Sequence, residues 1–352
     1  MVPRRDVVVI GASAGGVEAL TGLLATLPAD LAAAVLIVTH VPANSPGRLA
    51  RVLTRSGPLP AVMAADRQRL RAGRILVPRP DHHLLIGSDP DAEKASGMPG
   101  LTARVVYGPQ ENRVRPAVDP LFRSAARWCG PRAVAVVLSG ALDDGAAGAA
   151  AIAARAGTVL VQDPDEALFA GMPSATLAAV PDAAAHPIAE LGAAIADLVG
   201  TPAAEPASPT EHDLVVETDM VESGYPNDGR RPGTPIQLGC PDCGGGLNLI
   251  GTGGTTHYRC HVGHSFGPRT LATAKAHDAE TALWTTISAL QEQATIHRQL
   301  AETTDDGDAR ARHQAAAQQA DHSASTLREQ AQLWPELNPT PGDTPNTGNA
   351  NP

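Results

Sequence analysis

The chain has 352 residues, of which 43% are hydrophobic and 3% aromatic, and its formal net charge is −10 at pH 7. This apolar content supports a buried core, and the length allows one large domain or two domains. The acidic balance excludes a basic surface for nucleic acid or anionic lipid. No apolar run is long enough to span a bilayer and no signal peptide opens the sequence, so we expect a cytoplasmic protein without membrane insertion.

A β-branched run at residues 7–10 stops at Gly11, and a helical pattern begins at Val17. Ser13 lies between them in the motif Gly-x-Ser-x-Gly, which presents a serine hydroxyl at a turn from strand to helix. Backbone N–H groups at the start of such a helix favour developing negative charge. The motif predicts a nucleophile, and a helix cap is the alternative role for Ser13. The glycine spacing, G-x-x-x-G-G, does not fit the dinucleotide fingerprint G-x-G-x-x-G.

Short apolar runs then alternate with helical patterns. This alternation predicts right-handed βαβ units and an α/β fold with a doubly wound, mostly parallel sheet. The expected elements are a helix at 17–27, a strand at 34–39, a helix at 47–54, a strand at 75–78, a hairpin of 82–86 and 101–107, a helix at 119–129, a strand at 133–138, an alanine-rich helix to about 156 and a strand at 158–161.

Polar residues with hydrolytic chemistry follow three of these strands. Ser13, His40 and the pair Asp143 and Asp144 each come just after a strand ends. Functional groups of open parallel sheets gather at the carboxyl ends of the strands, so these positions are expected to meet. Such an arrangement fits a Ser-His-Asp triad. Taken singly, His40 fits a strand-end residue bonded to a backbone carbonyl, and the aspartates fit a helix N-terminus.

Several segments resemble the catalytic domain of the chemotaxis protein-glutamate methylesterase family, over about residues 6 to 197. They are Ile10-Gly11-Ala12-Ser13-Ala14-Gly15-Gly16, Thr39-His40-Val41-Pro42, Asn112-Arg113-Val114-Arg115-Pro116-Ala117-Val118-Asp119, Leu138-Ser139-Gly140 through Asp144-Gly145, and Gln162-Asp163 with Gly171-Met172-Pro173. The resemblance implies that Ser13, His40 and Asp144 are catalytic. Asp144 corresponds to the family's aspartate because it directly precedes the glycine of an Asp-Gly-x-x-Gly segment. The family's Thr-Gly-Met-Gly-x-Asp-Gly differs from the residues at 139–145 here.

The resemblance implies hydrolysis of L-glutamate γ-methyl esters on methyl-accepting chemotaxis-type receptors or related sensor proteins, with release of methanol, and also glutamine deamidation. It implies no cofactor for catalysis and a role in two-component signalling; the receptor, the pathway and the oligomeric state stay open. The alternative is a non-catalytic adaptor that keeps the esterase fold. Well-known members carry a phosphorylatable receiver ahead of the esterase, whereas this sequence starts at the esterase, so we expect control by other means. Arg113 and Arg115 either bind an acidic receptor surface or lie on a solvated loop.

A metal-binding pattern occurs late in the sequence. Cys240 and Cys243 form a C-x2-C pair, and Cys260 and His264 follow as C-x3-H. Three thiolates and one imidazole complete a tetrahedral zinc site without an open position, so we expect structural zinc. His264 is a better fourth ligand than His261 because a loop needs more residues to return to the metal. Unligated buried cysteines are the alternative.

Composition divides the sequence into five parts. They are a catalytic domain at 1–199, a flexible linker at 200–235, a zinc-ribbon-like module at 236–269, a helical hairpin at 270–334 and a disordered tail at 335–352. Apolar positions of the hairpin, such as Leu283, Ile287, Leu290 and Ile296, pack on each other or on a partner helix. Because a linker is expected between them, the catalytic domain and the zinc module are expected to be independent.

Overall fold

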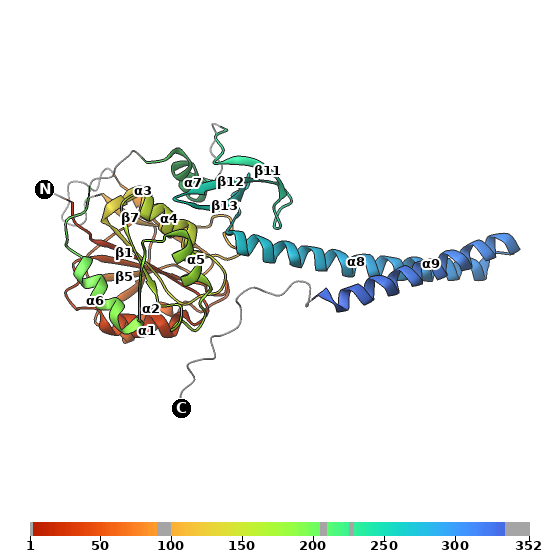
Figure 1. The fold of residues 1–352 in the computed structure, drawn as a ribbon, viewed down its shortest axis with the longest axis horizontal. Helices are drawn as coiled ribbons and strands as arrows, with labels where there is room; N and C mark the ends of the chain where they lie inside the picture. Colours follow the sequence, from red (N-terminus) through yellow and green to blue (C-terminus); the bar gives the residue numbers. More distant parts are fainter. Residues whose placement is uncertain (1–2, 90–99, 205–209, 225–228, 335–352) are drawn as a thin grey trace, which may run out of the picture. The chain divides into compact units, whose positions relative to one another are not determined.

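The computed structural model describes residues 3–89, 100–204, 210–224 and 229–334 (Figure 1). The strands are β1 (Val7–Ala12), β2 (Ala34–Thr39), β3 (Ala61–Met63), β4 (Gln68–Arg69), β5 (Arg74–Val77), β6 (His83–Ser88), β7 (Leu101–Val106), β8 (Ala133–Val137), β9 (Thr158–Gln162), β10 (Ala184–His186), β11 (Thr234–Gly239), β12 (Gly246–Thr252), β13 (Thr255–Cys260) and β14 (Ser265–Phe266). The helices are α1 (Gly16–Thr26), α2 (Leu49–Ser56), α3 (Val118–Trp128), a 3-10 turn (Gly130–Arg132), α4 (Ala146–Ala154), α5 (Gly171–Ala179), α6 (Ile188–Leu198), α7 (His212–Ser223), α8 (Pro268–Thr303) and α9 (Gly307–Gln332).

The central feature is a seven-stranded sheet in the order β10-β9-β8-β1-β2-β5-β3, in which every pair of neighbours is parallel. The strand β1 lies between β2 and β8, and Val7 pairs in register with both Ala34 and Ala133. The α/β fold with a doubly wound, parallel sheet is therefore confirmed. Because β1, β2 and β8 run side by side in one direction, the residues that follow them meet at one edge.

The central strands contribute alternate side chains to two cores on opposite faces of the sheet. Val7 and Val9 of β1 lie in a core with α3, α4 and α5, whereas Val8 and Ile10 lie in a core with α1, α2 and α6. Figure 1 shows these two groups of helices on opposite sides of the sheet. The expected hairpin is present as β6 and β7, which form a second, antiparallel sheet in the order β4-β7-β6 and pack on α3.

The prediction of a flexible linker at 200–235 is partly wrong, because residues His212–Ser223 form helix α7. This helix buries Leu214, Glu217 and Val221 at helical spacing and packs on α3 and β7. The surrounding stretch is rich in proline, alanine and acid, and this average composition obscured the short apolar face at its centre. Glu217 is buried because charged partners from other segments surround it, and the sequence around Glu217 gives no sign of them.

The metal-binding pattern lies in an antiparallel sheet of β11, β12, β13 and β14. Its small core includes Cys240, Cys260, Leu247 and Phe266. The described residues up to Leu271 form one compact unit, so this sheet belongs to the same unit as the parallel sheet. The expectation that the catalytic domain and the zinc module are independent is therefore wrong, because α4 packs directly against β12 and β13.

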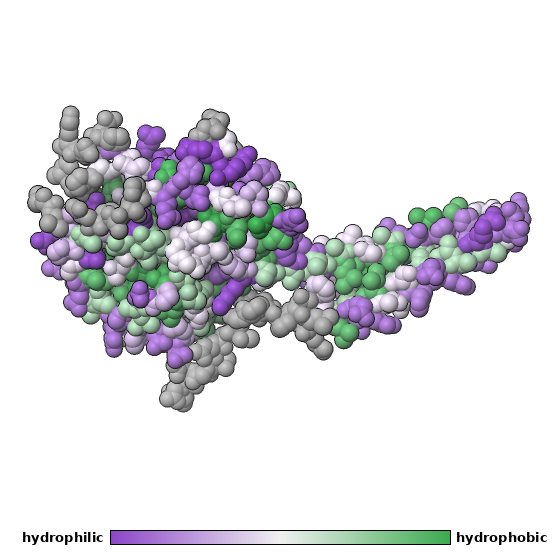
Figure 2. All heavy atoms as spheres, turned by 45° about the horizontal axis from the view of Figure 1, so that its top comes forward, coloured by the Kyte–Doolittle hydropathy of each residue, from purple (hydrophilic) through white to green (hydrophobic). Residues whose placement is uncertain are grey.

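A second unit begins at Ala272 and consists of most of α8 together with α9. The helical hairpin expected from the sequence is confirmed. Alanines dominate its buried positions, so the two helices pack closely, while Ile287 is buried and Ile296 is 55% exposed. Figure 2 shows apolar and hydrophilic surface interspersed along the hairpin. Within the described ranges no helix combines the length and apolarity needed to cross a bilayer, and the tail expected at 335–352 lies outside them.

Candidate functional site

Ser13 directly follows β1, in the turn that leads into α1. Its backbone N–H donates to the Ser139 carbonyl at 2.9 Å, and its own carbonyl accepts from Gly16 N at 2.8 Å. Gly15 occupies the N-cap of α1 in a left-handed conformation with φ 69°, which glycine adopts without strain. Because Gly15 holds the N-cap position and Ser13 Oγ bonds to His40, the Ser13 hydroxyl is not the cap of α1. The hydroxyl is left to interact across the edge of the sheet.

The structure joins three of the predicted site residues by hydrogen bonds. Ser13 Oγ lies 2.8 Å from Nδ1 of His40, the residue after β2. His40 Nε2 lies 2.7 Å from Asp144 Oδ2, in the loop after β8. An ionised carboxylate can only accept a hydrogen bond, so His40 Nε2 carries the proton and donates it to Asp144. The lone pair of Nδ1 then faces the serine hydroxyl.

Asp144 is buried and its carboxylate accepts hydrogen bonds from several donors. Besides His40, they are the backbone N–H groups of Val118 at 2.7 Å and Asp119 at 3.1 Å, and the side-chain amide of Asn112 at 2.9 Å. Burial alone raises the pKa of Asp144, but His40 and these donors outweigh it and lower the pKa to about 2. The carboxylate is therefore charged at any pH near neutral.

The neighbouring Asp143 has a different role in the structure. Its carboxylate accepts from Arg269 N at 2.7 Å and from the Thr270 hydroxyl at 2.6 Å, at the start of α8. Burial raises the pKa of Asp143 even though these bonds lower it. Of the aspartate pair, only Asp144 bonds to His40 among the described contacts.

Asn112 is a residue of the site that sequence reasoning did not single out, although it opens one of the matched motifs. Its Nδ2 donates to both Asp144 Oδ1 at 2.9 Å and Asp119 Oδ2 at 3.1 Å. Asn112 and Arg113 have φ of 52° and 62° in a two-residue turn, closed by paired backbone bonds between Glu111 and Val114. Asparagine is favoured at such a turn, which was the available signal.

The two arginines of this segment are bound to aspartates of the chain itself. Arg113 Nε lies 3.2 Å from Asp242, between the first two cysteines of the metal pattern. The Arg115 side chain is 10% exposed; it pairs with Asp81 at 2.7 Å and stacks 3.6 Å from the Tyr107 ring centroid. The expected contact with a receptor surface is not tested by these bonds.

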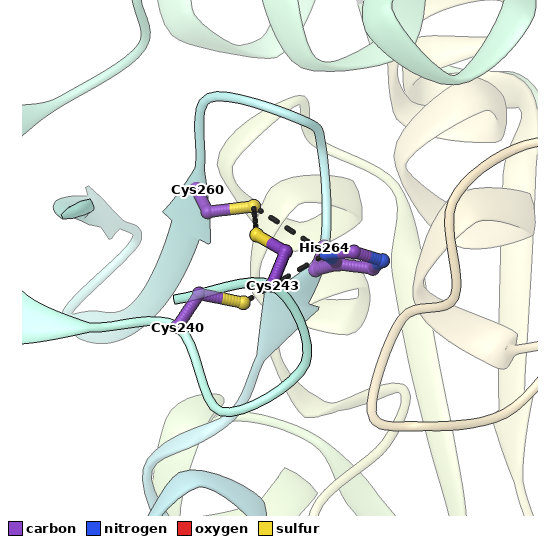
Figure 3. Close-up of side chains that lie close together, drawn as sticks. All are labelled: Cys240, Cys243, Cys260 and His264. Carbon is purple, nitrogen blue, oxygen red and sulfur yellow. Dashed lines mark hydrogen bonds between the residues drawn. The ribbon is translucent and has the colours of Figure 1, made fainter. Parts of the chain in front are cut away.

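Cys240, Cys243, Cys260 and His264 form a group that can hold a metal ion, as Figure 3 shows. Their ligand atoms all lie within 4.8 Å of one another. Cys243 and Cys260 sulfurs are 3.7 Å apart, and His264 Nδ1 lies 3.7 Å and 3.6 Å from the Cys240 and Cys260 sulfurs. A tetrahedral zinc with Zn–S of about 2.3 Å and Zn–N of about 2.0 Å requires separations of roughly 3.5–3.8 Å. The residues present fit such an ion.

A buried ionic cluster that sequence reasoning missed lies beside the Asn112 turn. Glu111 bonds to Arg123 and, at 2.7 Å, to Arg259. Glu217 of α7 accepts from Arg259 at 3.0 Å and contacts His257 at 2.7 Å. Burial raises the pKa of each glutamate, but the positive partners outweigh it and hold both pKa values below their usual range. The cluster joins the parallel-sheet region, α7 and the C-terminal sheet.

The doubly wound sheet, with a serine, a histidine and an aspartate hydrogen-bonded at its edge, defines an α/β protein with the arrangement of a serine hydrolase. The chain belongs to the CheB methylesterase family, whose model matches residues 8–195. It is 41% identical over 184 residues to a "Protein-glutamate methylesterase/protein-glutamine glutaminase" of Nocardioides sp., covering 52% of this chain and 48% of that protein. A protein of the same description, numbered 2, from Methanosarcina mazei is 37% identical over 169 residues, 48% of this chain and 45% of that protein.

Among solved structures, the Thermotoga maritima CheB methylesterase catalytic domain matches with a TM-score of 0.52 and 26% identity. The match covers 56% of this chain and all of that one. The chain spans about half the length of the curated relatives it matches. The C-terminal sheet with its cysteines, and the hairpin, lie outside the matched family segment.

Proposed function

We propose that this chain hydrolyses L-glutamate γ-methyl esters on chemotaxis-type receptor proteins, with release of methanol, and deamidates glutamine by the same chemistry. The observation that carries the proposal is the hydrogen-bonded series from Ser13 Oγ through His40 to Asp144, at 2.8 and 2.7 Å. Family membership and the activity named for the relatives support it. The substrate would be a side chain on the cytoplasmic part of the receptor.

In the proposed mechanism, Ser13 Oγ attacks the ester carbonyl while its proton moves to His40 Nδ1. The Asp144 carboxylate holds Nε2–H and stabilises the imidazolium. The positive end of the α1 dipole, which lies next to Ser13, favours the developing oxyanion. His40 then gives its proton to the departing methoxide, so methanol leaves and an acyl-serine remains. Water, activated by His40, cleaves the acyl-serine to glutamate and restores Ser13; with a glutamine substrate, ammonia leaves instead.

We propose zinc as the metal of the Cys3His group and assign it a structural role. Cys240, Cys243, Cys260 and His264 supply four ligands, which leaves no coordination position for substrate. The ion would stabilise the sheet of β11 to β14 by holding its two loops together. No step of hydrolysis passes through it.

Receptor recognition by Arg113 and Arg115 stays a prediction. The Arg113 side chain is 40% exposed and the Arg115 side chain 10%, so Arg113 is the better placed of the two to meet an acidic surface. If Arg113 serves this purpose, Arg113→Gln raises KM for methylated receptor and leaves KM for a small ester unchanged.

The test of the proposed function is methanol release from methylated receptor by Ser13→Ala. We expect loss of turnover with an unchanged circular dichroism spectrum. Ser56→Ala is the matched control, because the Ser56 hydroxyl bonds to Val52 within α2, and it should keep full activity. A fluorophosphonate probe should label Ser13 and label it far more slowly in His40→Ala. An unreactive Ser13 in a folded protein would reject the esterase and favour the adaptor.

A further inference from the structure

The segment that follows the metal ligand His264 touches the turn that holds Asp144. The Ser265 carbonyl accepts from Asn112 N at 2.7 Å, and Gly267 N donates to Asn112 Oδ1 at 2.8 Å. On its other side, Asn112 Nδ2 donates to Asp144. The side chain of Asn112 therefore lies between the C-terminal sheet and the carboxylate of the hydrogen-bonded series.

We propose that the metal-bearing C-terminal sheet is part of the active site, and that Asn112 is the positioning residue through which it holds Asp144. This inference rests on the proposed function. It extends that function to residues outside the matched segment 8–195, because Ser265 and Gly267 come from β14 and the turn into α8.

The Gly267 N–H is the donor that fixes the Asn112 amide from its oxygen side. An N–H donor can be met only by the amide oxygen, so Nδ2 must turn to the opposite side, where the carboxylates of Asp119 and Asp144 lie. Without this bond only the contacts of Nδ2 with Asp119 and Asp144 hold the amide, and its orientation toward Asp144 is less firmly fixed. The C-terminal segment thus supplies the orientation, and Asn112 supplies the donor.

Two further contacts connect the same regions. Asp143, next to Asp144 in the chain, accepts from the backbone N–H groups of Arg269 and Thr270. Arg113, at the tip of the Asn112 turn, pairs with Asp242 beside the metal-ligating cysteines. The loop of Asp144 and the turn of Asn112 are therefore both attached to segments whose conformation the metal group would set.

The first pair of variants changes glycines of the C-terminal region, and Gly267→Ala displaces the segment that holds both Asn112 and Asp143. A Cβ at Gly267 would lie 2.5 Å from the Asp143 carboxyl carbon, whereas a Cβ at Gly251 of β12 would meet nothing within 4 Å. We expect Gly267→Ala to reduce kcat for a small ester by about 10-fold or more with KM nearly unchanged, and Gly251→Ala to match wild type.

The second pair removes the donor. Asn112→Ala should reduce kcat by about 10-fold to 100-fold, as loss of a hydrogen bond to a charged group predicts. Asn248→Ala is its control, because Asn248 lies in the same sheet and its amide donates to the Pro232 carbonyl at 2.9 Å. The rate constant for fluorophosphonate labelling of Ser13 should fall with kcat in Asn112→Ala, while the final labelled fraction stays complete.

Zinc removal tests the metal directly. Chelation should lower the Ser13 labelling rate as zinc leaves, and added Zn²⁺ should restore it. A zinc-free protein that labels at the full rate would overturn the inference, as would Asn112→Ala and Gly267→Ala proteins that label like wild type. A lower labelled fraction at an unchanged rate would also overturn it, because that result reports only unfolding. If wild-type Ser13 does not react at all, the proposed function itself fails.

Discussion

Replacing Glu217 with glutamine tests whether the buried ionic cluster holds the unit together. The change keeps the shape of the side chain but removes one of two carboxylates. Glu217 Oε1 lies 3.0 Å from Arg259 Nε and 3.8 Å from Arg123 Nε, and all three side chains are at most 2% exposed. Opposite charges near 4 Å attract by about 4 kcal/mol at an effective dielectric constant of about 20. The lower cost of burying a neutral amide offsets part of this lost attraction in Glu217→Gln.

Removing one partner of a buried ion pair costs about 3–5 kcal/mol, and we expect Glu217→Gln to lower the free energy of unfolding by that amount. Denaturant unfolding by circular dichroism at pH 7 measures the loss, and amide exchange in α7 and β13 locates it. Glu211→Gln, at the exposed N-cap of α7, is the control with the same charge change. A loss no larger than that of the control would refute the importance of the cluster.

The acid dependence of stability gives the same test a second readout. The pKa of Glu217 is lower in the folded chain than in the unfolded chain, so its contribution is complete above about pH 5 and is lost as pH falls. Wild type should therefore lose more stability than Glu217→Gln between about pH 5 and pH 3. Parallel curves for the two proteins would contradict the charge argument.

Asp144→Asn should reduce kcat roughly 10³-fold to 10⁴-fold, because an amide there favours the wrong His40 tautomer; single-turnover kinetics at pH 7 measures it. With its pKa at about 2, Asp144 stays charged as pH falls to about 4, so acid inactivation above that pH cannot come from its protonation. Gly140→Ala should slow fluorophosphonate labelling of Ser13, since its Cβ would lie 2.9 Å from the Ser13 Cβ and 2.0 Å from the Met172 sulfur. Cys243→Ser should lower the zinc content measured by mass spectrometry, whereas Cys129→Ser, outside the metal group, should not.

The edge of the parallel sheet could be predicted from the sequence because each step depended on local patterns. Apolar runs located β1, β2 and β8, and the rule for parallel strands brought their ends together. The residues after these strands, Ser13, His40 and Asp144, then fell within hydrogen-bonding distance. The group of Cys240, Cys243, Cys260 and His264 could be predicted in the same way, because a tetrahedral metal site restricts the spacing of its ligands along the chain.

The contacts between the two regions could not be predicted because they depend on residues far apart in sequence. Glu111 and Arg259 are separated by 148 positions, and Asn112 and Gly267 by 155. Each looks like an ordinary polar or glycine residue in its own segment. The composition of residues 200–235 led to the prediction of an independent zinc module. In the structure, ion pairs of Glu217 attach that stretch to Arg123 of the parallel-sheet region and to Arg259 of the C-terminal sheet.

The departure from the family motif at residues 139–145 acquires a physical meaning in the structure. Leu142 stands where the family pattern has glycine, and it has φ 59°, a conformation that costs a leucine about 1–2 kcal/mol. Such strain persists where the surroundings determine the backbone. The next residue, Asp143, helps to hold the backbone of Leu142 in this conformation, because three hydrogen bonds join its carboxylate to Arg269 and Thr270 at the start of α8. A glycine adopts this conformation without strain, whereas a leucine here needs contacts such as those of Asp143 to offset the cost.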